Sequence, residues 1–414
     1  MIQNRLVILA ILTALNLVNY LDRFLVMAVS PRIQESLGLD DAQTGWVATA
    51  FMLGYFVTSP IFGYLGDRYP RRGLIAAGVA LWSLATVLSG FAPTYGAMIA
   101  ARIAVGIGEA SYATLGPTII DDLATPKSRN RMLAAFYVAI PVGSALGFIV
   151  GGLLEHRYGW RSAFFIAGGP GLLLALVTLL LHEPARAASA EAKQPAMVVY
   201  KELARTPQYV LTVLGYVAQT FALGGFTAWA APFLYRKLCL ELHQADSYFG
   251  AITVVTGLAG TAIGGVLADR WPGADRSQAY LRVCAWTSFI AAPLALVALR
   301  MPTATLFLVA LAACELAVFT SVSPVNAAIL QTVPPALRAT AMAVSIFMIH
   351  LFGDLVSPPL IGHISDAAGD ARAFCSGARG LQVGMYFLPA ALLVSAFAWL
   401  AGSRARRITS PDRA

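Results

Sequence analysis

The sequence predicts an all-α membrane protein of twelve transmembrane helices, arranged as two pseudo-symmetric six-helix bundles. Composition is the first indication, because 58% of the residues are hydrophobic and only 12% are charged, against about a quarter in soluble domains. The second is that the apolar residues fall into runs of about 20 or more, the length that crosses a bilayer as a helix. The third is a motif that recurs about 200 residues further along the chain, which indicates a duplicated architecture.

The apolar spans follow one another with short charged or Pro/Gly-rich loops between them. Helices are required because lipid offers backbone groups no hydrogen-bond partner, and the alternation typical of membrane barrels is missing. The first run continues through Val29, so we expect it to be the first helix and not a cleaved signal. The expected spans are residues 5–30, 43–66, 73–92, 95–122, 130–154, 161–182, 207–235, 245–269, 277–299, 303–331, 336–365 and 380–403.

One long polar connection divides these spans six and six. We expect an N-terminal bundle at 1–182, a cytoplasmic linker at 183–206 and a C-terminal bundle with a short cytoplasmic tail at 207–414. A short interfacial helix is expected near 196–204 within the linker. Parallel six-helix halves with a substrate site near the bilayer midplane are a known transporter plan.

The net charge of +8 follows membrane topology and does not indicate nucleic-acid binding. Loops on the side of the termini carry 19 Lys and Arg residues, the opposite loops carry 8, and Arg23 and Arg102 lie inside spans. The positive-inside rule therefore places both termini in the cytoplasm. We expect a multi-pass protein of the inner (plasma) membrane.

The four cysteines show no metal or redox spacing. Cys239 and Cys375 both fall near the outer face, where a disulfide is one alternative. The sequence favours the other alternative, in which both are unpaired small apolar residues.

The recurring motif reads Gly63-Tyr-Leu-Gly-Asp-Arg68 in the first half and Gly265-Val-Leu-Ala-Asp-Arg270 in the second. Each acid follows a span, where it can accept hydrogen bonds from a helix start in the other half, since a helix N-terminus favours negative charge. Asp67 is expected to meet the start of the eleventh span at Pro334-Pro335, and Asp269 the start of the fifth at Thr125-Pro126. The alternative is a topology anchor, but topology needs no acid. The predicted cytoplasmic gate comprises Gly63, Asp67, Arg68, Arg71, Arg72, Arg129, Asp269, Arg270 and Arg338.

Four charged residues lie inside apolar spans of the first half, where a charge costs several kcal/mol and is usually functional. Asp22 and Arg23 belong to the first span, while Arg102 and Glu109, seven residues apart, share a face of the fourth. One interpretation is a set of fixed pairs, Arg23 with Glu109 and Asp22 with Arg102, that only order the helices. The other is that Asp22 and Glu109 couple transport to protons, because burial raises a carboxylate pKa and a nearby arginine lowers it.

Further polar groups in the spans are candidates for contact with substrate. The two arginines can bind an anionic head group, since a guanidinium forks onto carboxylate or phosphate. His350 and Asp354 share a helix face, although they can also be packing or water-lining groups, as Glu315 can. The predicted substrate-binding residues are Asn19, Tyr20, Arg23, Arg102, Glu315, His350 and Asp354.

Small residues at a spacing of four in the fifth span, Gly143, Gly147 and Gly151, predict a flat packing face, and Pro141 permits a bend. Gly353 and Pro358-Pro359 mark a second flexible point in the eleventh span. Their role is either to allow rocking of the halves or purely structural.

With these motifs the chain resembles the major facilitator superfamily over its whole length, on the signature at 63–72. Its amino-terminal half is similar to the spinster family in Asn19-Tyr-Leu-Asp-Arg23, Phe62-Gly-Tyr-Leu-Gly-Asp-Arg68, Gly106-Ile-Gly-Glu-Ala-Ser-Tyr112, Arg131-Met-Leu and Phe136-Tyr-Val-Ala-Ile-Pro-Val-Gly-Ser144. The resemblance implies the major facilitator fold and a monomeric, proton-linked carrier, with Asp22, Arg23 and Glu109 at the coupling and substrate site. Animal members of that family move sphingolipids or lysophospholipids.

The expected function is therefore proton-coupled secondary transport by alternating access of an amphipathic lipid-like or drug-like substrate. The expected partners are membrane lipids, that substrate and protons, with no nucleic acid, no metal and no cofactor besides the proton gradient. An organic-anion/proton symporter for small acids is the alternative, which the low number of in-membrane cations disfavours. A non-transporting membrane sensor is a third hypothesis. An enzyme is not expected, because zinc-ligand spacing, a nucleotide loop and a nucleophile elbow are all missing from the sequence.

Overall fold

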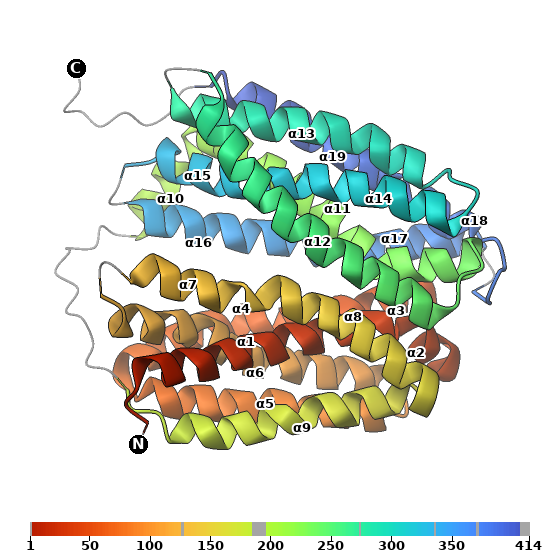
Figure 1. The fold of residues 1–414 in the computed structure, drawn as a ribbon, viewed down its shortest axis with the longest axis horizontal. Helices are drawn as coiled ribbons and strands as arrows, with labels where there is room; N and C mark the ends of the chain where they lie inside the picture. Colours follow the sequence, from red (N-terminus) through yellow and green to blue (C-terminus); the bar gives the residue numbers. More distant parts are fainter. Residues whose placement is uncertain are drawn as a thin grey trace. The chain divides into compact units, whose positions relative to one another are not determined.

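The computed structural model describes residues 2–125, 128–183, 196–272, 275–334, 337–369 and 372–405. The side chains of residues 129, 130, 134, 196–198 and 339 lie outside this description. Within these ranges the chain is helical, apart from turns, short connections and one isolated β-bridge (Figure 1).

Twelve stretches among the described residues are long and apolar enough to cross a membrane, as predicted. Each of their ends lies within four residues of the expected one. The linker helix expected near 196–204 is also present as α10 (Ala196–Ala204). The chain is a multi-pass membrane protein, and the sequence-based fold class is confirmed.

Helices of the first half include several spans that are broken into two pieces, as at Ala50 and Val138. The proline expected to bend the fifth span, Pro141, lies one turn after the second of these breaks. The helices are α1 (Arg5–Ala28), α2 (Ser30–Leu37), α3 (Asp41–Thr49), α4 (Phe51–Arg68), α5 (Arg71–Phe91), α6 (Tyr95–Leu123), α7 (Arg129–Tyr137), α8 (Ala139–Tyr158) and α9 (Trp160–Leu179).

The second half shows the same use of broken spans, and its eleventh span contains a π-helical turn, η2 (His350–Asp354). The π-turn includes the predicted flexible point Gly353 and ends shortly before Pro358. The remaining helices are α11 (Pro207–Lys237), α12 (Leu242–Arg270), α13 (Arg276–Ala298), α14 (Ala304–Thr320), α15 (Val322–Thr332), α16 (Arg338–Ile349), α17 (Ser357–Ala367), α18 (Arg379–Met385) and α19 (Phe387–Gly402).

The chain forms two compact units by its internal contacts. The first unit comprises Met1–Ser189 together with Glu241–Val254, and the second comprises Ala190–Leu240 and Val255–Ala414. The division follows the six-plus-six order of the spans except at α12, whose first turns belong to the first unit.

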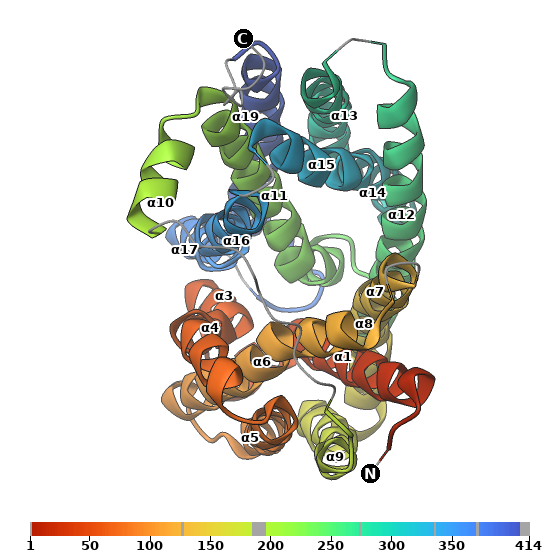
Figure 2. The same ribbon diagram turned by 90° about the vertical axis from the view of Figure 1, so that its left-hand side faces the viewer.

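Glycines in α8 let it lie directly against α1, and Figures 1 and 2 both place the two helices side by side. A Cβ added at Gly143 or Gly147 would come within 2.6 Å of the carbonyl oxygens of Leu17 and Leu21. The predicted packing face of the fifth span is therefore confirmed as a seat for the first span.

Backbone hydrogen bonds join the start of the first span to the end of the sixth. Ile2 donates its N–H to Leu180 O at 2.7 Å and accepts from His182 N at 2.9 Å, which makes the single parallel bridge to Leu181. Because six spans return the chain to the side on which it began, the two ends of this segment can meet, and the bridge joins them.

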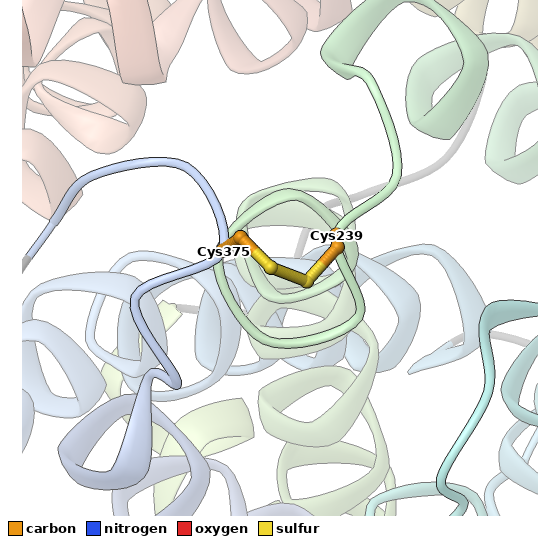
Figure 3. The surroundings of a disulfide bond; sticks show 2 residues. All are labelled: Cys239 and Cys375. Atoms are coloured by element: carbon orange, nitrogen blue, oxygen red, sulfur yellow. A yellow bond between two sulfur atoms is a disulfide. The ribbon is translucent and has the colours of Figure 1, made fainter.

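A disulfide joins Cys239 to Cys375 across a sequence separation of 136 residues (Figure 3). The preference for unpaired cysteines was therefore wrong. Cys239 follows α11 and Cys375 precedes α18, both in the second unit, and their Cα atoms lie 4.6 Å apart. Both have φ near +55°, so two left-handed turns bring the side chains together, which no sequence spacing reveals.

Candidate functional site

The four charges inside the first unit come together because α1 and α6 each present two of them. Successive residues of a helix point about 100° apart, so neighbouring Asp22 and Arg23 cannot share one partner. Residues seven apart repeat after about two turns, so Arg102 and Glu109 form one row on α6. Arg23 Nε donates to Glu109 Oε2 at 2.7 Å, and Arg102 Nη1 lies 3.9 Å from Asp22 Oδ2. Both of the pairs that the sequence raised as an alternative are present.

Asp22 has one further partner that the sequence analysis missed. Thr86 on α5 donates its hydroxyl to Asp22 Oδ2 at 2.7 Å, while Oδ1 has no hydrogen-bond partner in the described part of the chain. The signal was weak because a threonine inside an apolar helix commonly bonds its own backbone. The carboxylate thus has one satisfied and one vacant oxygen.

Arg23 is surrounded by aromatic rings as well as by its carboxylate. Its guanidinium carbon lies 5.1 Å, 4.9 Å and 5.3 Å from the ring centres of Tyr20, Phe51 and Tyr55. Rings at this distance attract a cation through their negative faces. The side chain keeps 14% of its surface exposed, whereas that of Glu109 keeps none.

Arg102 is the least satisfied group of the cluster. It is fully buried, and none of its three guanidinium nitrogens has a hydrogen-bond partner among the described residues. A guanidinium carries five N–H donors, and leaving them unmet in a buried site is costly. The predicted contact residue Asn19, which precedes Asp22 on α1, is also buried. Its Nδ2 has no hydrogen-bond partner among the described residues. Water or an anionic group can accept hydrogen bonds from these donors.

Close helix packing holds the cluster in place. A Cβ at Gly106 on α6 would overlap the backbone carbonyl of Phe51, and one at Gly54 on α4 would overlap that of Ile103. The two glycines therefore let α4 and α6 touch backbone to backbone. That contact sets the aromatic residues of α4 over Arg23.

In the second unit the predicted polar residues form two separate groups. Glu315 on α14 is 4% exposed and accepts from Thr256 Oγ1 at 2.9 Å. His350 Nδ1 and Asp354 Oδ2 lie 3.0 Å apart within the π-turn, a type of helix distortion frequent at functional sites.

An apolar recess of about 320 Å³ shares that π-turn. Phe352, between His350 and Asp354 in sequence, forms part of its wall. All lining residues are apolar: Leu214, Val217, Ala218, Phe221, Phe352, Phe387, Ala390, Ala391 and Val394.

In the predicted gate of the first unit, the arginines differ in environment. Arg71 is buried and bridges Asp122 Oδ2 at 2.7 Å and Glu183 Oε1 at 2.9 Å. Arg72 donates to the carbonyl of Leu181 at 3.1 Å. These two arginines fasten the start of α5 to the end of α6 and to the beginning of the linker, a structural role the motif alone does not reveal.

The other gate residues lie at the surface of their units or have local partners. Arg68 stacks on the Tyr64 ring at 3.5 Å, and Arg338 Nε donates to the Leu330 carbonyl at 2.9 Å. Gly63 lies in α4 in loose contact with Thr114, and the side chain of Arg129 lies outside the description. The exposed residues are Asp67, Asp269 and Arg270. The contacts predicted for the two acids would join the units and stay predictions; Pro126 and Pro335, on which they depend, lie outside the described residues.

Comparison with known proteins gives the family. The model of the Major Facilitator Superfamily matches residues 12–353. The chain is 37% identical over 386 residues to "Protein spinster homolog 1" of Bos taurus, covering 87% of this chain and 72% of that protein. The Homo sapiens homolog matches with the same identity and coverage. The chain belongs to the spinster family of the major facilitator superfamily.

Other relatives and solved structures agree with this membership. "Protein spinster" of Drosophila melanogaster is 36% identical over 377 residues, covering 86% of this chain and 61% of that protein. A crystal structure described as a bacterial homolog to the human lysosomal transporter spinster shares the fold, with a TM-score of 0.86, 24% identity and 97% coverage of both chains. A D-xylose-proton symporter is similar at a TM-score of 0.77 and 15% identity, covering 95% of this chain and 96% of that one.

The predicted resemblance is thus confirmed, and this spinster-family chain is a secondary transporter and not an enzyme. Besides Thr86, sequence reasoning missed Thr256 beside Glu315, the acidic partners of Arg71, and a buried acid, Asp246, treated below. Asp246 lies at the second position of its expected span. An acid is common at the end of a span, so the sequence gives no sign that this one is buried.

Proposed function

We propose that this spinster-family transporter moves an amphipathic, lipid-like or drug-like substrate in exchange or cotransport with protons, by alternating access. The observation that carries the proposal is Arg102, a fully buried guanidinium with unfilled donors, 3.9 Å from a carboxylate that has a vacant oxygen. Two cations and two carboxylates are packed together, but only the pair of Arg23 and Glu109 has a direct hydrogen bond.

The incomplete pairing supports proton coupling at Asp22 and Glu109. A proton bound by either carboxylate removes its negative charge and leaves an arginine without its counter-ion. That arginine then gains from binding an anionic head group, because a guanidinium matches carboxylate or phosphate. Proton and substrate occupancy are thereby linked through the same two arginines.

An amphipathic substrate is favoured over a small acid by what surrounds the charges. Arg23 and Arg102 are the arginines inside the spans of the first unit, and a sugar acid calls for a larger set of cations. In the second unit, the apolar recess offers a surface to an apolar tail; Phe352 of the π-turn lines it, whereas His350 and Asp354 do not.

The experiment is proton-driven flux in proteoliposomes. Asp22→Asn and Glu109→Gln should each abolish flux driven by a pH gradient, while Asp366→Asn, at an exposed ion pair with Arg372, should retain it. Full flux in both of the first two variants would refute the coupling role.

The substrate class is tested by thermal stabilisation of purified protein at two pH values. A lysophospholipid with an anionic head group should raise the melting temperature, a sphingoid base, whose head group is cationic, should raise it less, and a hexuronic acid should not. Stabilisation by the hexuronic acid and not by the lipids would favour the small-acid symporter. If none of the three compounds is transported, with or without a pH gradient, a sensor is favoured.

We also propose that both termini are cytoplasmic and that the protein resides in the inner (plasma) membrane. The excess of Lys and Arg in the loops on the terminal side supports this orientation. The disulfide adds independent support, because both of its cysteines follow odd-numbered spans and so face away from the amino terminus. Disulfides persist in oxidising compartments. The test is a C-terminal fusion to a reporter enzyme that works only outside the cytoplasm. Activity of that fusion would overturn the assignment.

A further inference from the structure

Asp246 is a buried acid for which the proposed transport mechanism has no use. It lies in the first turns of α12, in the part of that helix that packs within the first unit. Its exposed fraction is 0%, and neither carboxylate oxygen has a hydrogen-bond partner in the described part of the chain. A charged carboxylate in such a place is strongly disfavoured.

The seat of Asp246 is made by a glycine of α8. A Cβ at Gly152 would lie 3.0 Å from Asp246 Oδ2 and 3.2 Å from the Cα atom of His243. Gly250, one turn on, lies as close to α8, since its Cβ would be 3.1 Å from the carbonyl oxygen of Ala145. The start of α12 therefore rests directly on α8 at these two glycines.

Within the described ranges, the charged group that acts on Asp246 is an acid and not a counter-ion. On α8, Glu155 acts on Asp246 as a like charge, and its own partner is Arg32, at 2.9 Å from α2. Arg32 also pairs with Glu35 at 3.1 Å, so its positive charge is shared between two carboxylates. The acid is thus held beside a negative group whose cation is already engaged.

Two imidazoles close the same contact. The rings of His156 on α8 and His243 on α12 lie 4.3 Å apart and nearly parallel, at 31°. Stacked rings tolerate at most one positive charge at this distance, since two would repel. Repulsion between two charged rings would therefore oppose the same helix contact.

We propose that Asp246 is a proton-binding carboxyl that keeps the start of α12 seated on α8 only while it holds its proton. Release of that proton to water leaves a carboxylate that the seat cannot accommodate, so the contact opens. Alternation of the spans places this contact at the membrane face opposite the amino terminus. The site is separate from Asp22 and Glu109, and the proposal stands or falls independently of coupling there.

The test measures access to the seat from that face. Ala245, fully buried beside Asp246, is replaced by cysteine in a background with Cys284→Ala and Cys314→Ala, which removes the free thiols but keeps the disulfide. Intact cells are labelled with a membrane-impermeant maleimide between pH 7.5 and 9, where an ordinary imidazole is about nine-tenths neutral or more. Gln244→Cys, exposed one residue earlier, corrects for thiol ionisation.

The corrected labelling of Ala245→Cys should rise across this range by up to about tenfold per pH unit, the limit for a one-proton equilibrium. With Asp246→Asn added, labelling should stay low and flat, because the amide is a neutral isostere. Gly152→Ala should raise labelling at every pH by wedging the seat open. A rise that persists in Asp246→Asn, or no rise with Asp246 present, overturns the proposal. Failure of Asp246→Asn to fold also overturns it, because a neutral group must fit where a protonated carboxyl fits.

Discussion

The ion pair between Arg23 and Glu109 allows a quantitative test of how strongly α1 and α6 are coupled. The two groups meet at 2.7 Å with 14% and 0% of their side-chain surfaces exposed. Removing one partner of a buried pair costs about 3–5 kcal/mol, because the other charge stays buried without compensation. Glu109→Gln should lower the free energy of unfolding by about 3 kcal/mol, the low end of that range, since the amide oxygen can still accept from Arg23.

Removing both charges should restore much of this loss. Arg23→Met alone leaves Glu109 unpaired and should cost about as much, whereas the double variant buries no lone charge. We therefore expect a coupling energy of about 2 kcal/mol from the double-mutant cycle, measured by reversible unfolding in mixed micelles.

The matched control is the pair of Arg372 and Asp366, which has a similar separation of 2.8 Å but side chains 40% and 21% exposed. A surface pair contributes only about 0.2–1 kcal/mol, so the same cycle there should give a coupling energy in that range. If the Arg23–Glu109 cycle gives no more than the control, burial does not strengthen the pair and the reasoning fails.

Two further predictions concern packing and gating. Gly106→Ala should destabilise the first unit by several kcal/mol, of the order of other overpacked cores, because its Cβ overlaps the Phe51 carbonyl, while Gly73→Ala, with nothing within 4 Å, should leave thermal unfolding unchanged. Asp67→Asn should increase labelling of cysteines from the cytoplasmic side if the acid holds that side closed, and unchanged labelling would count against a gate at this motif.

Hydropathy predicted the spans well because the bilayer sets their length and composition directly. The two ion pairs could also be predicted, since Arg102 and Glu109 share a helix face and only two carboxylates and two arginines lie well inside the first six expected spans. Such reasoning works where few partners exist and helical periodicity fixes their direction.

Other features depend on tertiary contacts that leave no local pattern. The disulfide needs two left-handed turns 136 residues apart in sequence. Arg71 looks like a loop charge until Asp122 and Glu183 are seen around it. Asp246 is buried only because a glycine of α8 leaves room for it, and no periodicity within α12 predicts that.

The bond between Cys239 and Cys375 closes a covalent ring around the eighth to eleventh spans. A chain pulled from its carboxyl end would release the last span first. The force would then pass through the disulfide from Cys375 to Cys239, so the chain between these two cysteines would not extend. Reducing the disulfide should therefore lengthen the extension step that follows release of the last span. The disulfide thus sets the order in which the spans of this half unfold under force.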